Sequence, residues 1–126
     1  VGPYSGQSVH FQTHAPEKMP YAVNRYRFEA KRHYAILNDK LANSRYVLGD
    51  DYTIVDMAAW GWARLIPRVL DAAAWDDLPN LKRLVDEIDA RPATKRALAL
   101  LSSHTFKTEM DAESHRNMFP SNVGRS

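Results

Sequence analysis

Residues 46–60, YVLGDDYTIVDMAAW, carry the most specific local signal in the chain. Thr53 and Asp56 have the spacing of a capping box. In that motif the Thr53 hydroxyl accepts a hydrogen bond from the Asp56 amide, and the Asp56 carboxylate accepts one from the Thr53 amide. We therefore expect a helix that starts at Thr53, with Asp56 as a structural cap and not a catalyst. Gly49 and the two aspartates after it predict a turn before this helix.

Apolar residues continue beyond the capping box at helical spacing, and they predict a central, mostly buried helix. These residues are Ile54, Met57, Ala58, Gly61, Trp62, Leu65, Ile66 and Val69. Gly61 lowers helix propensity within this stripe, so we expect it to admit a close-packed neighbour. Pro67 predicts a kink in the helix or its end.

Helical periodicity extends over the rest of the chain and predicts an all-α bundle of about five helices. A long amphipathic helix is expected at residues 21–42, with Val23, Tyr26, Ala30, Tyr34, Leu37 and Leu41 on one face. A shorter helix is expected before it, at about residues 6–14. Two more follow, one burying Leu78, Leu81, Leu84, Val85 and Ile88 and one, after Pro92, burying Ala97, Leu98 and Leu101. We expect the helical domain to span residues 1–101 and a tail, residues 102–126, to pack along it.

Composition narrows the class of protein. A length of 126 residues, 44% of them hydrophobic, fits one domain. The absence of cysteine excludes disulfides, thiolate zinc sites and a cysteine nucleophile from these residues, and it suits a reducing compartment. A formal net charge of +2 is mild, and no window approaches the roughly 18 apolar residues of a membrane span, so we expect a soluble chain that binds neither nucleic acid nor membrane. Because Val1 opens the sequence, we expect a longer parent chain.

A basic cluster lies within the long predicted helix. It consists of Arg25, Arg27, Lys31 and Arg32. Helical spacing lets Glu29 pair with Arg25 and Arg32, so a solvated face explains most of the cluster. Arg25 is the member that we single out as a ligand-binding residue, because a guanidinium can hold a carboxylate through two parallel hydrogen bonds.

His10 and His14 have the i, i+4 spacing of two metal ligands on one helix. No third ligand lies nearby in sequence, so we expect no metal and interpret His10 beside Phe11 as packing or as the lip of a pocket. The three tryptophans could line a pocket, although aromatic residues at helical spacing belong to the core more often. No P-loop, dinucleotide fingerprint or Ser-His-Asp order is present, and we predict no catalytic residue in this chain.

Residues 46–60 resemble the loop and capping-box helix of the C-terminal helical domain of cytosolic glutathione transferases. Other segments look like the bacterial Nu-class transferases and their glutathione-dependent disulfide-reductase relatives. They are Gly2-Pro3, Gly6-Gln7, His10-Phe11, Ala15-Pro16-Glu17-Lys18, Tyr21-Ala22, Arg25-Tyr26 and Glu29, with Arg91-Pro92-Ala93 similar to the start of the family's last core helix. Two departures from the family pattern are Val55, where Ala is usual, and Gly61, where Pro is often found.

The resemblance implies a fold and a set of ligand contacts. A thioredoxin-like N-terminal domain, absent from this chain, would bind glutathione, while the helical domain would supply the acceptor-substrate wall and much of a homodimer interface. Gln7 and Arg25 would contact glutathione, Arg25 reaching the ligand of the partner subunit. His10, Phe11 and Trp62 would lie near the acceptor, a small electrophile, peroxide or disulfide. The whole protein would be a cytoplasmic glutathione transferase, and this domain alone would be inactive.

Two other function classes stay open on the residues alone. Helical domains of this kind also serve as noncatalytic protein interaction modules, which would keep the capping box and need no glutathione contact. Nucleic-acid binding through the face from Arg25 to Arg32 is a third hypothesis. It predicts an affinity that falls steeply as salt is added. The presence of both Gln7 and Arg25 favours the glutathione-dependent enzyme over the interaction module.

Overall fold

The computed structural model describes residues 1–105, 107 and 109–122, and its elements there are helices joined by loops. Its elements are α1 (Gly2–Val9), a π-helical turn η1 (His10–His14), α2 (Pro20–Leu41), α3 (Ile54–Ala63), α4 (Ile66–Val69), a 3₁₀ segment η2 (Ala72–Asp77), α5 (Pro79–Asp89), α6 (Pro92–Ser103), α7 (Ala112–Met118) and η3 (Pro120–Asn122). Between residues 46 and 49 a single isolated bridge forms, and the described residues contain no strand. The predicted all-α class is confirmed.

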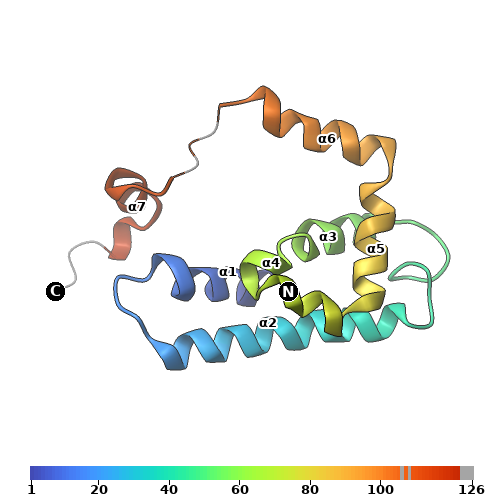
Figure 1. Cartoon of the computed structure of the whole chain (residues 1–126), viewed down its shortest axis with the longest axis horizontal. Coiled ribbons are helices and arrows are strands. Elements are labelled where there is room, and N and C mark those ends of the chain that lie inside the picture. Colours follow the sequence, from blue (N-terminus) through green and yellow to red (C-terminus); the bar gives the residue numbers. More distant parts are fainter. Residues whose placement is uncertain (106, 108, 123–126) are drawn as a thin grey trace.

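The helices α1 and α2 lie side by side and run in opposite directions along one edge of the molecule (Figure 1). Helix α5 crosses the far end of α2, and α3 and α4 lie between α1 and α5. Helix α6 leaves the end of α5 and projects away from this body, and the chain then returns so that α7 lies near the end of η1. The predicted burial of two α6 residues is wrong, because Leu101 is 55% exposed and Ala97 is also exposed.

The core forms between α2 and α5. Ala30, Tyr34 and Leu41 on α2 are buried, as the periodicity predicts, and so are Leu78, Leu81, Leu84, Val85 and Ile88 at α5. Burying each such leucine contributes about 2 kcal/mol of transfer free energy. Asn38 of α2 joins the two helices, because its Oδ1 accepts hydrogen bonds from the amides of Asn80 at 2.9 Å and Leu81 at 3.3 Å. Two donors at the start of α5 are thereby satisfied by a neighbouring helix.

The capping box at the start of α3 is confirmed. The Asp56 Oδ2 atom accepts the Thr53 amide at 2.8 Å, and the Thr53 Oγ1 atom accepts the Val55 amide at 3.2 Å. The second carboxylate oxygen, Oδ1, accepts the Val47 amide at 2.8 Å, a bond that the sequence pattern does not predict. Gly49, with φ of 125°, provides the turn that brings Val47 back to the helix, a conformation that glycine adopts without steric cost.

The predicted burial of the apolar stripe is wrong for α3. Ile54 is 77% exposed, Met57 49%, Trp62 41% and Leu65 40%, whereas Asp56 and Ala63 are fully buried. Gly61 has no neighbour within 4 Å of where a Cβ would lie, so nothing in the described chain packs closely on it. Periodicity identifies the apolar face of a helix but not the body that covers it. The stripe also breaks, because α3 ends at Ala63 and α4 begins as a separate helix with Pro67 in its first turn.

Candidate functional site

Helix α1 is fastened to α2, α3 and α4 by two buried serines. The Ser5 hydroxyl lies 2.9 Å from the Tyr34 hydroxyl, which donates a hydrogen bond to the Trp62 carbonyl at 3.1 Å. The Ser8 hydroxyl donates to the Val69 carbonyl at 2.7 Å. Both serines are buried with their hydrogen bonds made, so α1 and the helices that face it hold a fixed separation.

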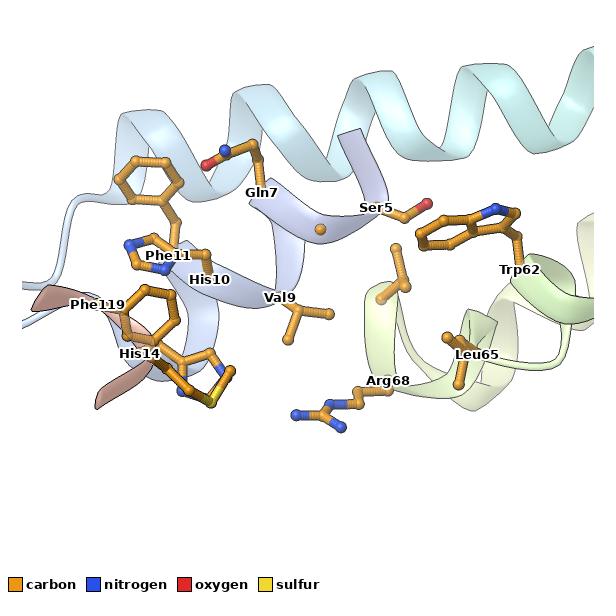
Figure 2. A pocket seen from close by; sticks show the side chains of 13 residues that line it. Ser5, Gln7, Val9, His10, Phe11, His14, Trp62, Leu65, Arg68 and Phe119 are labelled. Atoms are coloured by element: carbon orange, nitrogen blue, oxygen red, sulfur yellow. The ribbon is translucent and has the colours of Figure 1, made fainter. Parts of the chain in front are cut away.

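A cavity of about 530 Å³ lies between α1, η1, α3, α4 and the tail that contains α7. Its wall is mostly apolar and aromatic, and its volume suits a small organic molecule. Of the predicted site residues, Gln7, His10, Phe11 and Trp62 all line it (Figure 2). The structure therefore brings together four side chains from α1, η1 and α3 that the resemblance assigned to glutathione or acceptor contacts.

The Trp62 ring stands at one end of this cavity, close to the start of α1. A Cβ atom at Gly2 would lie 2.8 Å from the Trp62 ring, so only glycine leaves room for the indole there. At the other end Phe11 stacks on Tyr26 of α2, with ring centroids 5.3 Å apart, and meets His10 edge to face at 5.2 Å. His10 and Phe11 thus pack against aromatic rings and also line the cavity, and their contact with an acceptor stays a prediction.

Arg25 lies on α2 and does not contribute to the cavity wall. Its guanidinium pairs with Glu29 at 2.6 Å, and Arg32 binds the other oxygen of the same carboxylate at 2.7 Å and 2.9 Å, as the helical spacing predicts. The hydrogen bond from Arg32, more than any other contact, lowers the pKa of Glu29. The Arg25 side chain remains about half exposed, and its contact with glutathione stays a prediction.

Arg27 has a structural role that the sequence did not indicate. Its guanidinium donates to the Gln12 Oε1 atom at 2.8 Å, to the Leu70 carbonyl and to the Asp71 carboxylate at 2.7 Å. These bonds tie α2 to η1 and to the segment after α4. The basic cluster is therefore largely engaged in contacts within the protein, which weakens the nucleic-acid hypothesis.

The tail contributes a wall of the cavity that sequence reasoning missed. Phe119 packs on His10, His14 and His115, with ring centroids 5.0, 5.6 and 5.1 Å apart. The His115 Nε2 atom lies 2.9 Å from the His14 carbonyl oxygen. Met118-Phe119, two large apolar residues that stand side by side in a mostly polar tail, is the signal that could have predicted this contact.

Three further features define the chemistry of the cavity. Burial, followed by the charge of Arg68 on α4, lowers the pKa of His14 from its ordinary value of 6.5. Arg68 itself borders the cavity and was not singled out by sequence reasoning. No group of three metal-ligating side chains occurs in the part of the chain that the structure describes.

The fold is an all-helical domain with a mostly apolar cavity between α1, η1, α3 and α4. Residues 10–92 match the family described as glutathione S-transferase, C-terminal domain, and the chain belongs to that family. The family predicted from the sequence is therefore confirmed.

Three known proteins illustrate the similarity. The disulfide-bond oxidoreductase YfcG of Escherichia coli is 40% identical over 99 residues, which cover 78% of this chain and 45% of that protein. The disulfide-bond oxidoreductase YghU of the same organism is 44% identical over 92 residues, covering 69% and 32%. A glutathione transferase family member from Pseudomonas fluorescens, solved with two glutathione molecules bound, superposes with a TM-score of 0.70 at 32% identity, covering 77% and 45%.

The chain spans less than half the length of these relatives. Among the described residues, no helix is both long enough and apolar enough to cross a membrane.

Proposed function

We propose that this chain is the acceptor-side half of a cytoplasmic, homodimeric enzyme that uses glutathione to conjugate a small electrophile or to reduce a disulfide or peroxide. The cavity carries the proposal, because it joins Gln7, His10, Phe11 and Trp62 in one mostly apolar space. Relatives named as disulfide-bond oxidoreductases and a related structure with bound glutathione support the same chemistry.

The second half of the enzyme would be a thioredoxin-like domain that binds glutathione and activates its thiol. The exposed apolar face of α3, formed by Ile54, Met57 and Trp62 and continued by Leu65 just after the helix, supports such a neighbour. Apolar surface of this kind is stabilised when another domain removes it from water. Because Trp62 and Leu65 also line the cavity, that domain would lie beside the acceptor and bring the thiol to it.

Arg25 would hold a glutathione carboxylate, and Gln7 would add a hydrogen bond. Glu29, held by Arg32 as well as by Arg25, would fix the orientation of the Arg25 side chain. Positioning of a flexible charged peptide in this way lowers the entropic part of the activation barrier.

The test is Arg25→Ala in the full-length protein, with Arg32→Ala as the matched control, because both arginines pair with Glu29. We expect Arg25→Ala to lower kcat/KM for glutathione by an amount worth about 1.5–3 kcal/mol, the range for a lost charged hydrogen bond, and Arg32→Ala to have a smaller effect. Equal kcat/KM values in both variants and the wild type would show that Arg25 does not bind glutathione.

A full-length protein without glutathione-dependent activity that retains one stoichiometric protein partner would instead favour the noncatalytic interaction module. The cavity argues against that function, because a module that binds proteins through an exposed helix face needs no cavity of small-molecule size.

A further inference from the structure

Arg68 is an exposed cation at the edge of the cavity. It extends from α4 toward His14 along the lower side of the space drawn in Figure 2. Its guanidinium makes no hydrogen bond, ion pair or ring contact with any described residue. Its charge contributes to the lowered pKa of His14. Arg64, one turn earlier, differs in that it lies over the Trp60 ring at 5.1 Å from the ring centroid.

No acidic side chain among the described residues forms an ion pair with Arg68. None of the described residues that line the cavity is Asp or Glu. A neighbouring hollow of about 560 Å³ shares Arg68 and adds Glu109 and Lys107, but Glu109 forms no ion pair with Arg68, and Lys107 pairs with Asp111 at 2.6 Å. Because the pKa of His14 is lowered, that imidazole is neutral at pH 7 and Arg68 provides the local positive charge.

A lone guanidinium beside an apolar wall suits one kind of ligand. Val9, Phe11, Leu65 and Val69 offer apolar contact along the space between η1 and α4. Arginine binds a carboxylate or a similar anion through paired hydrogen bonds, and the bond strengthens where water is partly excluded. A neutral apolar molecule would leave this donor unused.

Resting on the proposed function, we infer that the acceptor substrate has an apolar or aromatic body and carries a carboxylate or similar anion, which Arg68 binds. The body occupies the cavity between Phe11 and Trp62, and the charged end points toward α4. Arg68 thus determines acceptor specificity and takes no part in activating the glutathione thiol.

Carboxylates also occur on glutathione, so a second glutathione is the other possible source of the anion. The apolar lining favours an apolar body over a polar peptide. An experiment with both kinds of probe separates the two sources.

The experiment measures equilibrium binding to the full-length protein, with glutathione in its own site, by calorimetry. The probes are 2-naphthoate and its uncharged counterpart 2-naphthamide, and S-methylglutathione serves as the peptide probe. The variants are Arg68→Gln and Arg68→Lys, and Arg96→Gln on exposed α6 is the control that removes one positive charge away from the cavity.

We expect Arg68→Gln to weaken 2-naphthoate binding about tenfold, the effect of losing one charge-assisted hydrogen bond, and to leave 2-naphthamide unchanged. Arg68→Lys should restore part of the affinity, and Arg96→Gln should change neither probe. Equal losses for both probes, no loss, or a loss confined to S-methylglutathione would overturn the inference.

Turnover measurements on the same proteins separate this inference from the proposed function. If the wild type consumes glutathione with charged and neutral aromatic disulfides at equal kcat/KM, and Arg68→Gln changes neither value, the specificity inference fails and the proposed enzyme stands. If no acceptor is turned over with glutathione, the proposed function fails, and the inference about its acceptor fails with it.

Discussion

The two faces of α3 follow from one helical stretch of sequence, yet they end in different environments. The inner face is satisfied within the chain, because Asp56 and Ala63 are fully buried and both Asp56 oxygens accept backbone hydrogen bonds. The outer face presents Ile54 and Met57 to the exterior, 77% and 49% exposed. Since apolar surface gains stability only when it is removed from water, the outer face contributes little to the fold of this chain.

The outer face itself divides along its length. At the start of α3, nothing in the described chain covers Ile54. At the end of the helix, Trp62 and Leu65 form part of the cavity that Met118 and Phe119 of the tail also line. The inner face therefore builds the domain, the start of the outer face is left exposed, and its end lines the cavity.

Asp56→Ala gives the largest expected effect and tests the inner face. The substitution removes the cap and leaves the amides of Val47 and Thr53 without acceptors. We expect it to lower the free energy of unfolding by about 3–4 kcal/mol, the sum of a lost cap and a buried unsatisfied donor. Urea unfolding followed by circular dichroism measures this change.

Asp51→Ala is the control, because Asp51 is exposed in the same loop and outside the capping box. It should change the unfolding free energy by less than about 0.5 kcal/mol. A loss below about 1 kcal/mol for Asp56→Ala would show that residues 46–53 hold their conformation without the carboxylate.

A matched pair of isoleucines compares the two environments directly. Ile66 at the start of α4 is fully buried, and Ile54 is mostly exposed. Ile66→Ala should cost about 3 kcal/mol through lost burial and an unfilled cavity, and Ile54→Ala should cost less than about 0.5 kcal/mol in the 126-residue chain. Chemical denaturation of the two variants tests both values.

The unfolding free energies of Ile54→Ala and Ile66→Ala in the full-length protein test whether a second domain covers the outer face of α3. If a second domain covers the outer face, the cost of Ile54→Ala should rise above about 1 kcal/mol there, and that of Ile66→Ala should stay the same. An Ile54→Ala cost that remains near zero in the longer protein would argue against a domain on this face.

Much of the fold could be predicted from the sequence because its determinants are local. The capping box depends on residues three apart, and the buried face of α5 depends on spacing within one helix. The exposed face of α3 could not be predicted, because a hydrophobic pattern does not say whether its partner lies in the same chain. The hydrogen bond from the Val47 amide to Asp56 could not be predicted either, because it depends on the turn at Gly49 that brings a loop amide to the helix.

Resemblance to the family named four of the residues that line the cavity, and it gave no indication of the wall that the tail supplies. Gln7, His10, Phe11 and Trp62 line the cavity, whereas Arg25, named on the same grounds, does not. Arg68 carries no local motif that separates it from other surface arginines, and its position follows from the packing of α4 against α1. Phe119 reaches the histidines of η1 across almost the whole length of the chain, a contact that no periodicity encodes.

The smallest expected effect concerns the other side of the cavity, where α7 contacts η1. His14 has a lowered pKa, chiefly through burial and then through Arg68, His10 and His115. When α7 is released, His14 loses part of its burial and the charge of His115, so its pKa rises toward the ordinary value of 6.5, whereas in the docked structure the imidazole stays neutral to lower pH. The released state therefore binds more protons, and the docking of α7 should weaken as the pH falls below about 6.5 and be fully present above it.

Amide hydrogen exchange of residues 112–118, corrected for the intrinsic effect of pH, measures this docking at pH 7.5 and 5.5. We expect modestly lower protection at pH 5.5 in the wild type and a flatter response in His14→Gln, which cannot take up the proton. The pairing of Lys107 with Asp111 should not contribute, because the pKa of Asp111 is lowered by that contact and the carboxylate stays charged throughout the range. If the wild-type response is unchanged in His14→Gln, another group causes the pH dependence. The packing of Phe119 would then be the main contact that holds the tail on the body.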